Sequence, residues 1–162
     1  MALGWFHKNE KKPPYRLYAE WIYRTLVEGR VREIQPERML LPLETHRRYH
    51  EKALLYREVM SLCALWATTR THVYLLPVLR EYESLLDAKG VRRGIRASQG
   101  QLVDAAVEDL NQMFKDPFKW AQRWLMEFRD NPNSEVGIQP FADHCIQQYE
   151  SFLSTLQKYQ PK

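Results

Sequence analysis

The feature that most constrains this fold is a long apolar stripe between Thr45 and Lys89 that recurs at the helical period of about 3.6 residues. No glycine interrupts the stretch, so its length and its period both favour helix over strand. We therefore expect one long central helix. The residues that share the apolar face of this helix are Leu55, Val59, Leu62, Trp66, Thr69, Val73 and Leu76.

Pro77 is the one proline inside this stretch. Its ring has no amide hydrogen to donate and would clash with the preceding turn of a helix. A straight helix over the whole stretch would span about 65 Å, which exceeds the width of an ordinary small domain. We therefore predict that the central helix is kinked at Pro77, with a break there or an overhanging end as the alternatives.

Several other segments show helical patterns with recognisable start signals. A helix is predicted over residues 14–28, after Pro13 and Pro14 and before Gly29, and a short helical turn over 37–41. Thr45 is expected to cap the central helix, and Ser98 with Gln101 matches a capping box. Asp116 followed by Pro117 predicts another helix start, and the last helix is expected to begin near Pro140.

No segment alternates in the way that strands do, and no repeat period is visible. The sequence therefore predicts an all-α fold: an irregular bundle of four to six helices around a long central helix kinked at Pro77. We assign residues 1–12 to a flexible arm and residues 13–160 to a single helical domain.

Composition agrees with a soluble globular protein, with 44% hydrophobic and 27% charged residues. No apolar run approaches the roughly 20 residues that a bilayer span needs, and the N-terminal apolar run is too short for a secretory signal. We expect a cytoplasmic protein whose arm does not bind membranes. Cys63 and Cys145 are expected to be reduced, because their spacing fits neither a CxxC pair nor a zinc site.

Charge is unevenly divided along the chain. Residues 1–96 hold 18 basic and 11 acidic side chains, a net +7, whereas residues 97–162 hold 6 and 9, a net −3. The two halves could neutralise each other within the fold, or the first could offer a basic face to an acidic partner. The densest basic cluster precedes a predicted helix start, where free amides also favour anions. This candidate anion site consists of Lys89, Arg92, Arg93 and Arg96.

Metal and cofactor signatures are missing from the sequence. His46 and His50 share one helix face, but Arg47 and Arg48 beside them disfavour a bound cation. No glutamate is followed by histidine three residues later, which argues against a di-iron bundle. The phosphate-binding loops and nucleophile motifs of common enzyme families are also missing. We therefore predict no metal, no cofactor and no catalytic set.

Polar groups on the central stripe are the remaining candidates for chemistry. Glu51, Glu58 and Arg80 point near the centre of the apolar face, and His72 lies at its edge. A buried carboxylate near a histidine could shift either pKa and perform acid–base chemistry. The alternative is pairing with arginines of other helices. The candidate pocket consists of Glu51, Glu58, Trp66 and His72.

Three functional classes remain open on these grounds. The leading prediction is a non-enzymatic helical interaction module, such as an adaptor, assembly factor or regulatory subunit, with a protein partner or a second copy of itself. One alternative is a protein that binds nucleic acid or another polyanion through the basic first half and the 89–96 loop. The other is a small-molecule binder or enzyme with a pocket between helices near Glu58 and His72.

Overall fold

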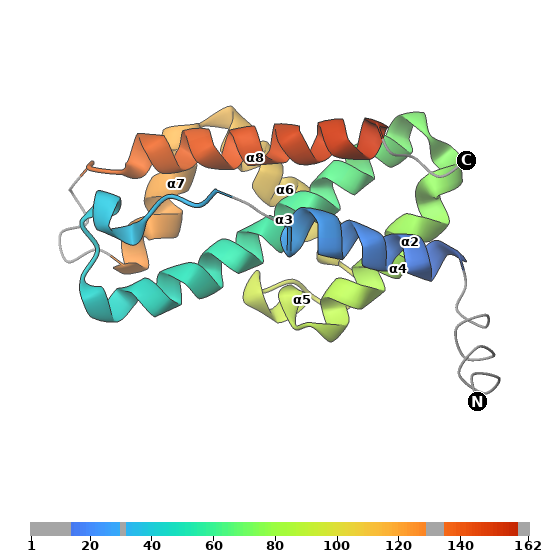
Figure 1. Cartoon of the computed structure of the whole chain (residues 1–162), viewed down its shortest axis with the longest axis horizontal. Coiled ribbons are helices and arrows are strands. Elements are labelled where there is room, and N and C mark those ends of the chain that lie inside the picture. Colours follow the sequence, from blue (N-terminus) through green and yellow to red (C-terminus); the bar gives the residue numbers. More distant parts are fainter. Residues whose placement is uncertain (1–13, 30–31, 129–134, 159–162) are drawn as a thin grey trace.

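The computed structural model describes residues 14–29, 32–128 and 135–158. Over these residues it confirms the all-α prediction, with seven α-helices and no strand (Figure 1). The predicted arm at 1–12 and the outermost residues of the predicted domain lie outside the described ranges. The α-helices are α2 (Pro14–Ile22), α3 (His46–Thr71), α4 (Leu76–Ala88), α5 (Val91–Gly94), α6 (Leu102–Lys115), α7 (Pro117–Leu125) and α8 (Ile138–Lys158).

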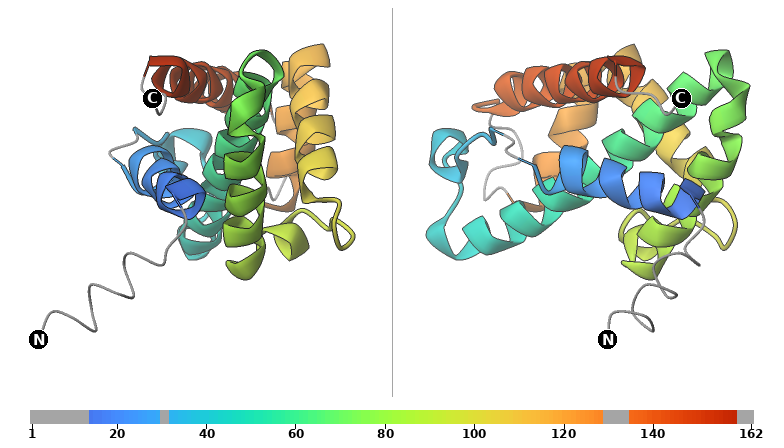
Figure 2. Two further views of the ribbon diagram at one scale, coloured as in Figure 1. Left: turned by 90° about the vertical axis from the view of Figure 1, so that its right-hand side faces the viewer. Right: turned by 45° about the vertical axis from the view of Figure 1, so that its right-hand side comes forward.

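Helix α3 is the centre of the bundle, as its stripe predicts. It packs against α4, α6 and α8, with α2 and α8 on one side of it and α6 on the other (Figure 2). Residues 58–65 are all buried, so the middle of α3 is enclosed on every side rather than along one stripe. Met60 lies off the predicted apolar face and is nevertheless only 3% exposed. A helix enclosed on all sides must bury its polar residues too.

The predicted single helix kinked at Pro77 is wrong, because the chain breaks five residues earlier. Helix α3 ends at Thr71, and His72 takes an extended backbone with φ −129° and ψ 76°. A 3₁₀ turn, η4 (Val73–Leu75), then leads into α4. Pro77 lies in the first turn of α4, where its missing amide hydrogen has no partner to lose. The break also turns the stripe away from the core, leaving Val73 exposed.

The predicted helix at 14–28 is present, but its second half is a π-helix, η1 (Tyr23–Val27). The wider turn brings the Thr25 carbonyl close to the Cα of Gly29, leaving no room there for a side chain. The predicted turn at 37–41 is the 3₁₀ helix η2 (Pro36–Met39), and a second 3₁₀ turn, η3 (Leu43–Thr45), leads into α3. A last 3₁₀ turn, η5 (Met126–Phe128), follows α7 directly.

Of the three predicted side-chain caps, one is confirmed and two are wrong. Asp116 caps α7 as predicted, since its Oδ1 accepts the Lys119 amide at 3.1 Å. The Thr45 hydroxyl instead donates to the Pro42 carbonyl, so it does not cap α3. The predicted Ser98 cap is also wrong, because α6 begins only after Gln101 and has no local side-chain cap.

A carboxylate from another helix replaces the missing cap of α6. The Val103 amide donates to Oε2 of Glu83 in α4 at 3.1 Å. The negative charge lies at the positive end of the α6 dipole and accepts from an amide that has no partner within the helix. The cap therefore also fixes α6 against α4.

None of the helices within the described ranges combines the length and the apolar character needed to cross a bilayer.

Replacing Glu83 with alanine should destabilise the fold by about 1 kcal/mol, the usual cost of a lost N-cap. Glu83→Gln keeps an acceptor without the charge and should cost less. Urea unfolding measures both, with Ser84→Ala as the control, since Ser84 is the exposed neighbour on the same helix. Equal stability of the Glu83→Ala and Ser84→Ala proteins would contradict the cap.

Candidate functional site

Glu58 is the candidate pocket residue that the structure buries, at 6% exposure. Its Oε2 accepts the hydroxyl of Tyr23 in η1 at 2.9 Å. Burial raises the pKa of Glu58, although the Tyr23 hydrogen bond and the nearby Lys89 and Arg57 act in the opposite direction. Burial and the Glu58 contact in turn raise the pKa of Tyr23, so this phenol remains a donor at neutral pH.

A second buried polar pair lies one turn along α3. The Ser61 hydroxyl donates to the Glu58 carbonyl at 2.7 Å and lies 2.6 Å from the Tyr82 hydroxyl of α4. Ser61 and Tyr82 are both fully buried. Together with Glu58 and Tyr23 they join η1, α3 and α4 through side chains that satisfy one another. These four residues form a buried polar cluster, and we infer that its role is to hold η1 and α4 on α3.

The other candidate pocket residues are not brought to Glu58. Glu51 is exposed and pairs with Arg47 at 3.3 Å on the same helix. Trp66 lies under the Arg70 guanidinium, and His72 contacts the Thr71 hydroxyl at 2.9 Å at the helix break. At 1.5 Å rise per residue, Glu51 and the α3 terminus are about 30 Å apart. These side chains therefore do not line one pocket.

The basic residues of the 89–96 loop also have different surroundings. The Lys89 ammonium lies 4.3 Å from the centre of the Tyr23 ring, a cation–π contact. Arg92, which lies in α5, pairs with Asp87 of α4 at 2.9 Å. Arg93 and Arg96 are exposed. The next long helix, α6, already has the Glu83 carboxylate at its first turn. Anion binding at this loop stays a prediction.

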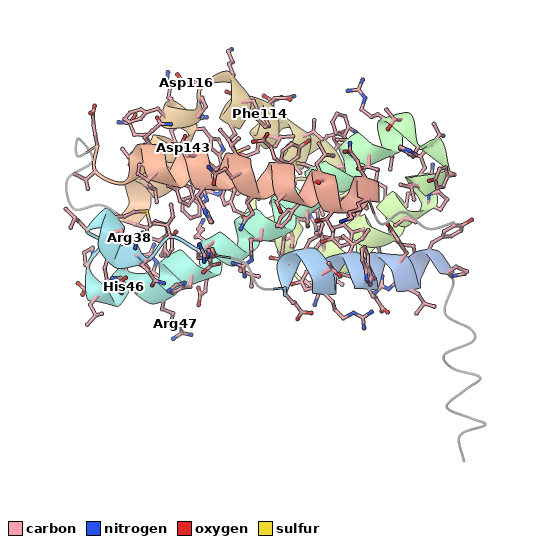
Figure 3. The ribbon with its side chains drawn as sticks, turned by 45° about the horizontal axis from the view of Figure 1, so that its top comes forward. Arg38, His46, Arg47, Phe114, Asp116 and Asp143 are labelled. Atoms are coloured by element: carbon pink, nitrogen blue, oxygen red, sulfur yellow. The ribbon has the colours of Figure 1, made fainter. Side chains whose placement is uncertain are left out.

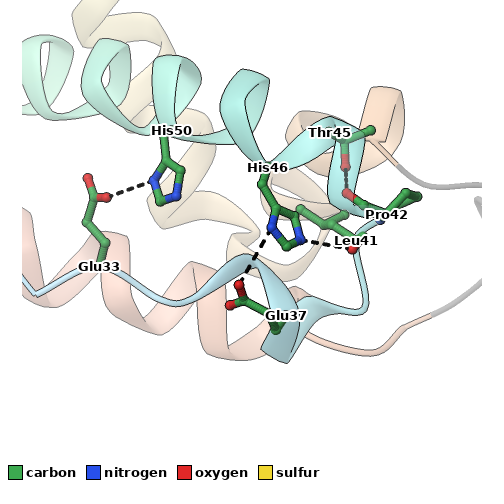
Figure 4. Close-up of polar contacts among 7 residues, drawn as sticks. All are labelled: Glu33, Glu37, Leu41, Pro42, Thr45, His46 and His50. Atoms are coloured by element: carbon green, nitrogen blue, oxygen red, sulfur yellow. Dashed lines mark hydrogen bonds and ion pairs between the residues drawn. The ribbon is translucent and has the colours of Figure 1, made fainter.

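His46 and His50 face glutamates of the segment that crosses the start of α3 (Figure 4). We call residues 32–45 the strap. His46 Nδ1 lies 3.6 Å from Glu37, and its Nε2 lies 3.1 Å from the Leu41 carbonyl. His50 Nδ1 lies 3.3 Å from Glu33. The two histidines thus bind the strap, and no group of metal-ligating side chains is present among the described residues.

Arg57 makes a further attachment of the strap to α3. Its guanidinium pairs with Glu33, and its Nε donates to the Val27 carbonyl at the end of η1 at 3.2 Å. The Arg57 and Glu33 side chains are 16% and 24% exposed, so the pair is shielded from water more than a surface pair. Sequence reasoning missed both residues, because nothing in the local pattern links positions 24 apart.

The middle of the strap presents two leucines to solvent. Leu40 and Leu43 are 73% and 79% exposed, whereas Met39 and Leu41, the two neighbours of Leu40, are buried. Leu40 has φ 55° and ψ 37°, the left-handed conformation that disfavours residues with a side chain. Exposed Arg38 and Arg47 lie at the same end of the molecule (Figure 3).

No family model, no curated protein and no solved structure matches this chain.

Glu58→Gln should stabilise the protein at neutral pH, because it keeps the oxygen that accepts from Tyr23 and removes a buried charge. A raised pKa means that the folded state holds this proton more tightly than the unfolded state. Wild-type stability should therefore fall as pH rises from the ordinary glutamate range, about pH 4, through the raised pKa. The difference between the two proteins should grow over that interval.

Chemical unfolding from pH 3.5 to 8 measures this difference. Glu51→Gln is the matched control, since Glu51 lies on the same helix and is exposed. A Glu58→Gln protein that is less stable than wild type at pH 7 would show that Lys89 and Arg57 outweigh the burial of the charge.

Leu40→Asn should stabilise the fold by about 0.5–1 kcal/mol, because asparagine tolerates the left-handed conformation better than leucine. Little apolar burial is lost, as Leu40 is exposed. Leu43→Asn is the control, since Leu43 is equally exposed but does not have positive φ. Urea unfolding compares the three proteins. A loss above about 1 kcal/mol on Leu40→Asn alone would contradict the inferred strain.

Proposed function

We propose that this chain is a non-catalytic helical interaction module that docks on another protein through Leu40 and Leu43 of the strap. The observation that carries the proposal is an exposed leucine in a strained backbone conformation. Glycine or asparagine at position 40 would make the folded state more stable, because both tolerate positive φ. The leucine side chain buries little apolar surface there, because it is exposed.

The strap holds these leucines in a fixed geometry. Met39 and Leu41 are buried on either side of Leu40, and Met39 packs against Gly137 at the start of α8. Earlier in the strap, Glu33 and Glu37 pair with side chains of α3. An apolar contact that is ordered before binding loses less conformational entropy when a partner arrives.

Charge around the leucines favours a protein partner over a polyanion. Exposed charges of both signs lie close to the leucines in the sequence: Arg38 and Arg47, but also Glu44, and Glu51 pairs with Arg47. Nucleic acid favours basic surfaces without such acidic neighbours. An apolar pair within a rim of both signs fits a partner protein whose apolar cleft is bordered by mixed charge.

We also propose a cytoplasmic location. Cys63 and Cys145 are both buried and unpaired, and burial raises the pKa of each thiol. Unoxidised, inert thiols of this kind are typical of proteins in a reducing compartment.

Site-specific photo-crosslinking tests the docking proposal. A benzophenone side chain at position 43 of the purified protein, irradiated in native lysate, should give one discrete adduct with a second protein. Leu40→Asp in the same chain should reduce that adduct by about tenfold, the effect of about 1.4 kcal/mol at an interface. Unfolding of each variant confirms that the fold is kept.

The control places the benzophenone at Tyr74, another exposed apolar position, at the corner between α3 and α4. Adducts from position 74 and none from position 43 would overturn the proposal, as would a position-43 adduct that Leu40→Asp leaves unchanged. An adduct of twice the chain mass would overturn the choice of a different protein and identify a second copy as the occupant.

A further inference from the structure

A groove of about 450 Å³ opens between α3, α6 and α7. It lies where α3 packs on α6 and α6 on α7. One wall is aromatic, and the α6 wall carries two carboxylates, Asp109 and the exposed Glu108, which accepts from Gln112. The residues that line the groove include Tyr56, Asp109, Trp120, Trp124, Lys52 and Arg123.

The aromatic wall is held rigidly by the core. The Tyr56 ring is perpendicular to Trp120 and to Trp124, with centroids 5.1 and 4.8 Å away. Both indoles stack on Phe141 of α8 behind them. Tyr56 and Trp124 are partly exposed, whereas Trp120 is 3% exposed. The groove therefore presents parts of Tyr56 and Trp124 to a ligand.

Asp109 lies against this aromatic wall. Its Oδ1 accepts the indole N–H of Trp120 at 3.2 Å, and the Tyr56 hydroxyl lies near the carboxylate. Burial raises the pKa of Asp109 despite these two groups and the nearby Arg123. No ion pair of Asp109 with another described residue is present. The Trp120 indole is a neutral donor, so it positions the carboxylate without balancing a negative charge on it; a bound cation would balance that charge and favour the ionised form.

We propose that this groove binds the head of an organic cation, an ammonium or guanidinium group, between Asp109 and the rings of Tyr56 and Trp124. A carboxylate beside aromatic rings attracts such a cation by charge and by the negative faces of the rings. Arg123, which also lines the groove, repels further positive charge, so the site takes one cationic head rather than a polycation. The head can belong to a free amine or to a lysine or arginine side chain.

NMR titration of the full chain tests the site. The probes are tetramethylammonium chloride and N-acetyl-lysine methylamide, with sodium chloride at equal ionic strength as the reference. Binding should shift the indole N–H signals of Trp120 and Trp124, assigned from Trp→Phe variants, at concentrations of about 1–10 mM. Stronger binding of tetramethylammonium identifies a free quaternary amine as the source, and stronger binding of the lysine analogue identifies a protein side chain.

Asp109→Asn is the decisive variant, because it keeps an oxygen for the Trp120 indole and removes the charge. It should weaken both probes by at least about tenfold. Asp104→Asn is the matched control, since Asp104 is exposed on the same helix, and should leave both affinities unchanged. Unfolding curves confirm that each variant folds. Binding that survives Asp109→Asn, or the lack of any shift beyond the sodium chloride reference, would overturn the proposal.

Discussion

Complete enclosure of the middle of α3 is the constraint on which the rest of the structure depends. Once residues 58–65 are covered on all sides, Glu58 and Ser61 have no water to bind and need partners from other elements. Tyr23 and Tyr82 supply them from η1 and α4. The packing of η1 and α4 on α3 is therefore specified by directional polar contacts as well as by apolar area, which selects one arrangement among several that would bury the same surface.

Long-range polar contacts of this kind recur through the described chain. Glu33 joins the strap to Arg57, Arg57 reaches the end of η1, and Glu83 caps a helix twenty residues away. Each contact satisfies a group that its own element leaves unpaired. The bundle is thus irregular for a physical reason: its segments are positioned by individual side chains rather than by a repeated helix-to-helix packing pattern.

The sequence predicted those features that depend on neighbours along the chain. Apolar periodicity identified α3, α6 and α8, and the Asp116 cap followed from residue type alone. The break at His72 was missed because nothing local marks it. Pro77, which seemed to mark a kink, fits the first turn of α4 equally well. Glu58 was singled out on the stripe, but its partner Tyr23 lies 35 residues earlier and has no sequence signal. The backbone strain at Leu40 and the groove beside Asp109 could not be predicted from the sequence either, because both arise from tertiary packing.

The Glu83 cap links the order of two distant segments. Within α6 the Val103 amide has no carbonyl one turn earlier to accept its hydrogen, so its protection depends on α4 being in place. When α4 moves away from the bundle, the first turn of α6 loses an acceptor and a favourable charge together. The two helices should then open as one cooperative unit, and exchange of the Val103 amide with solvent would report the docking of α4 rather than the fraying of α6.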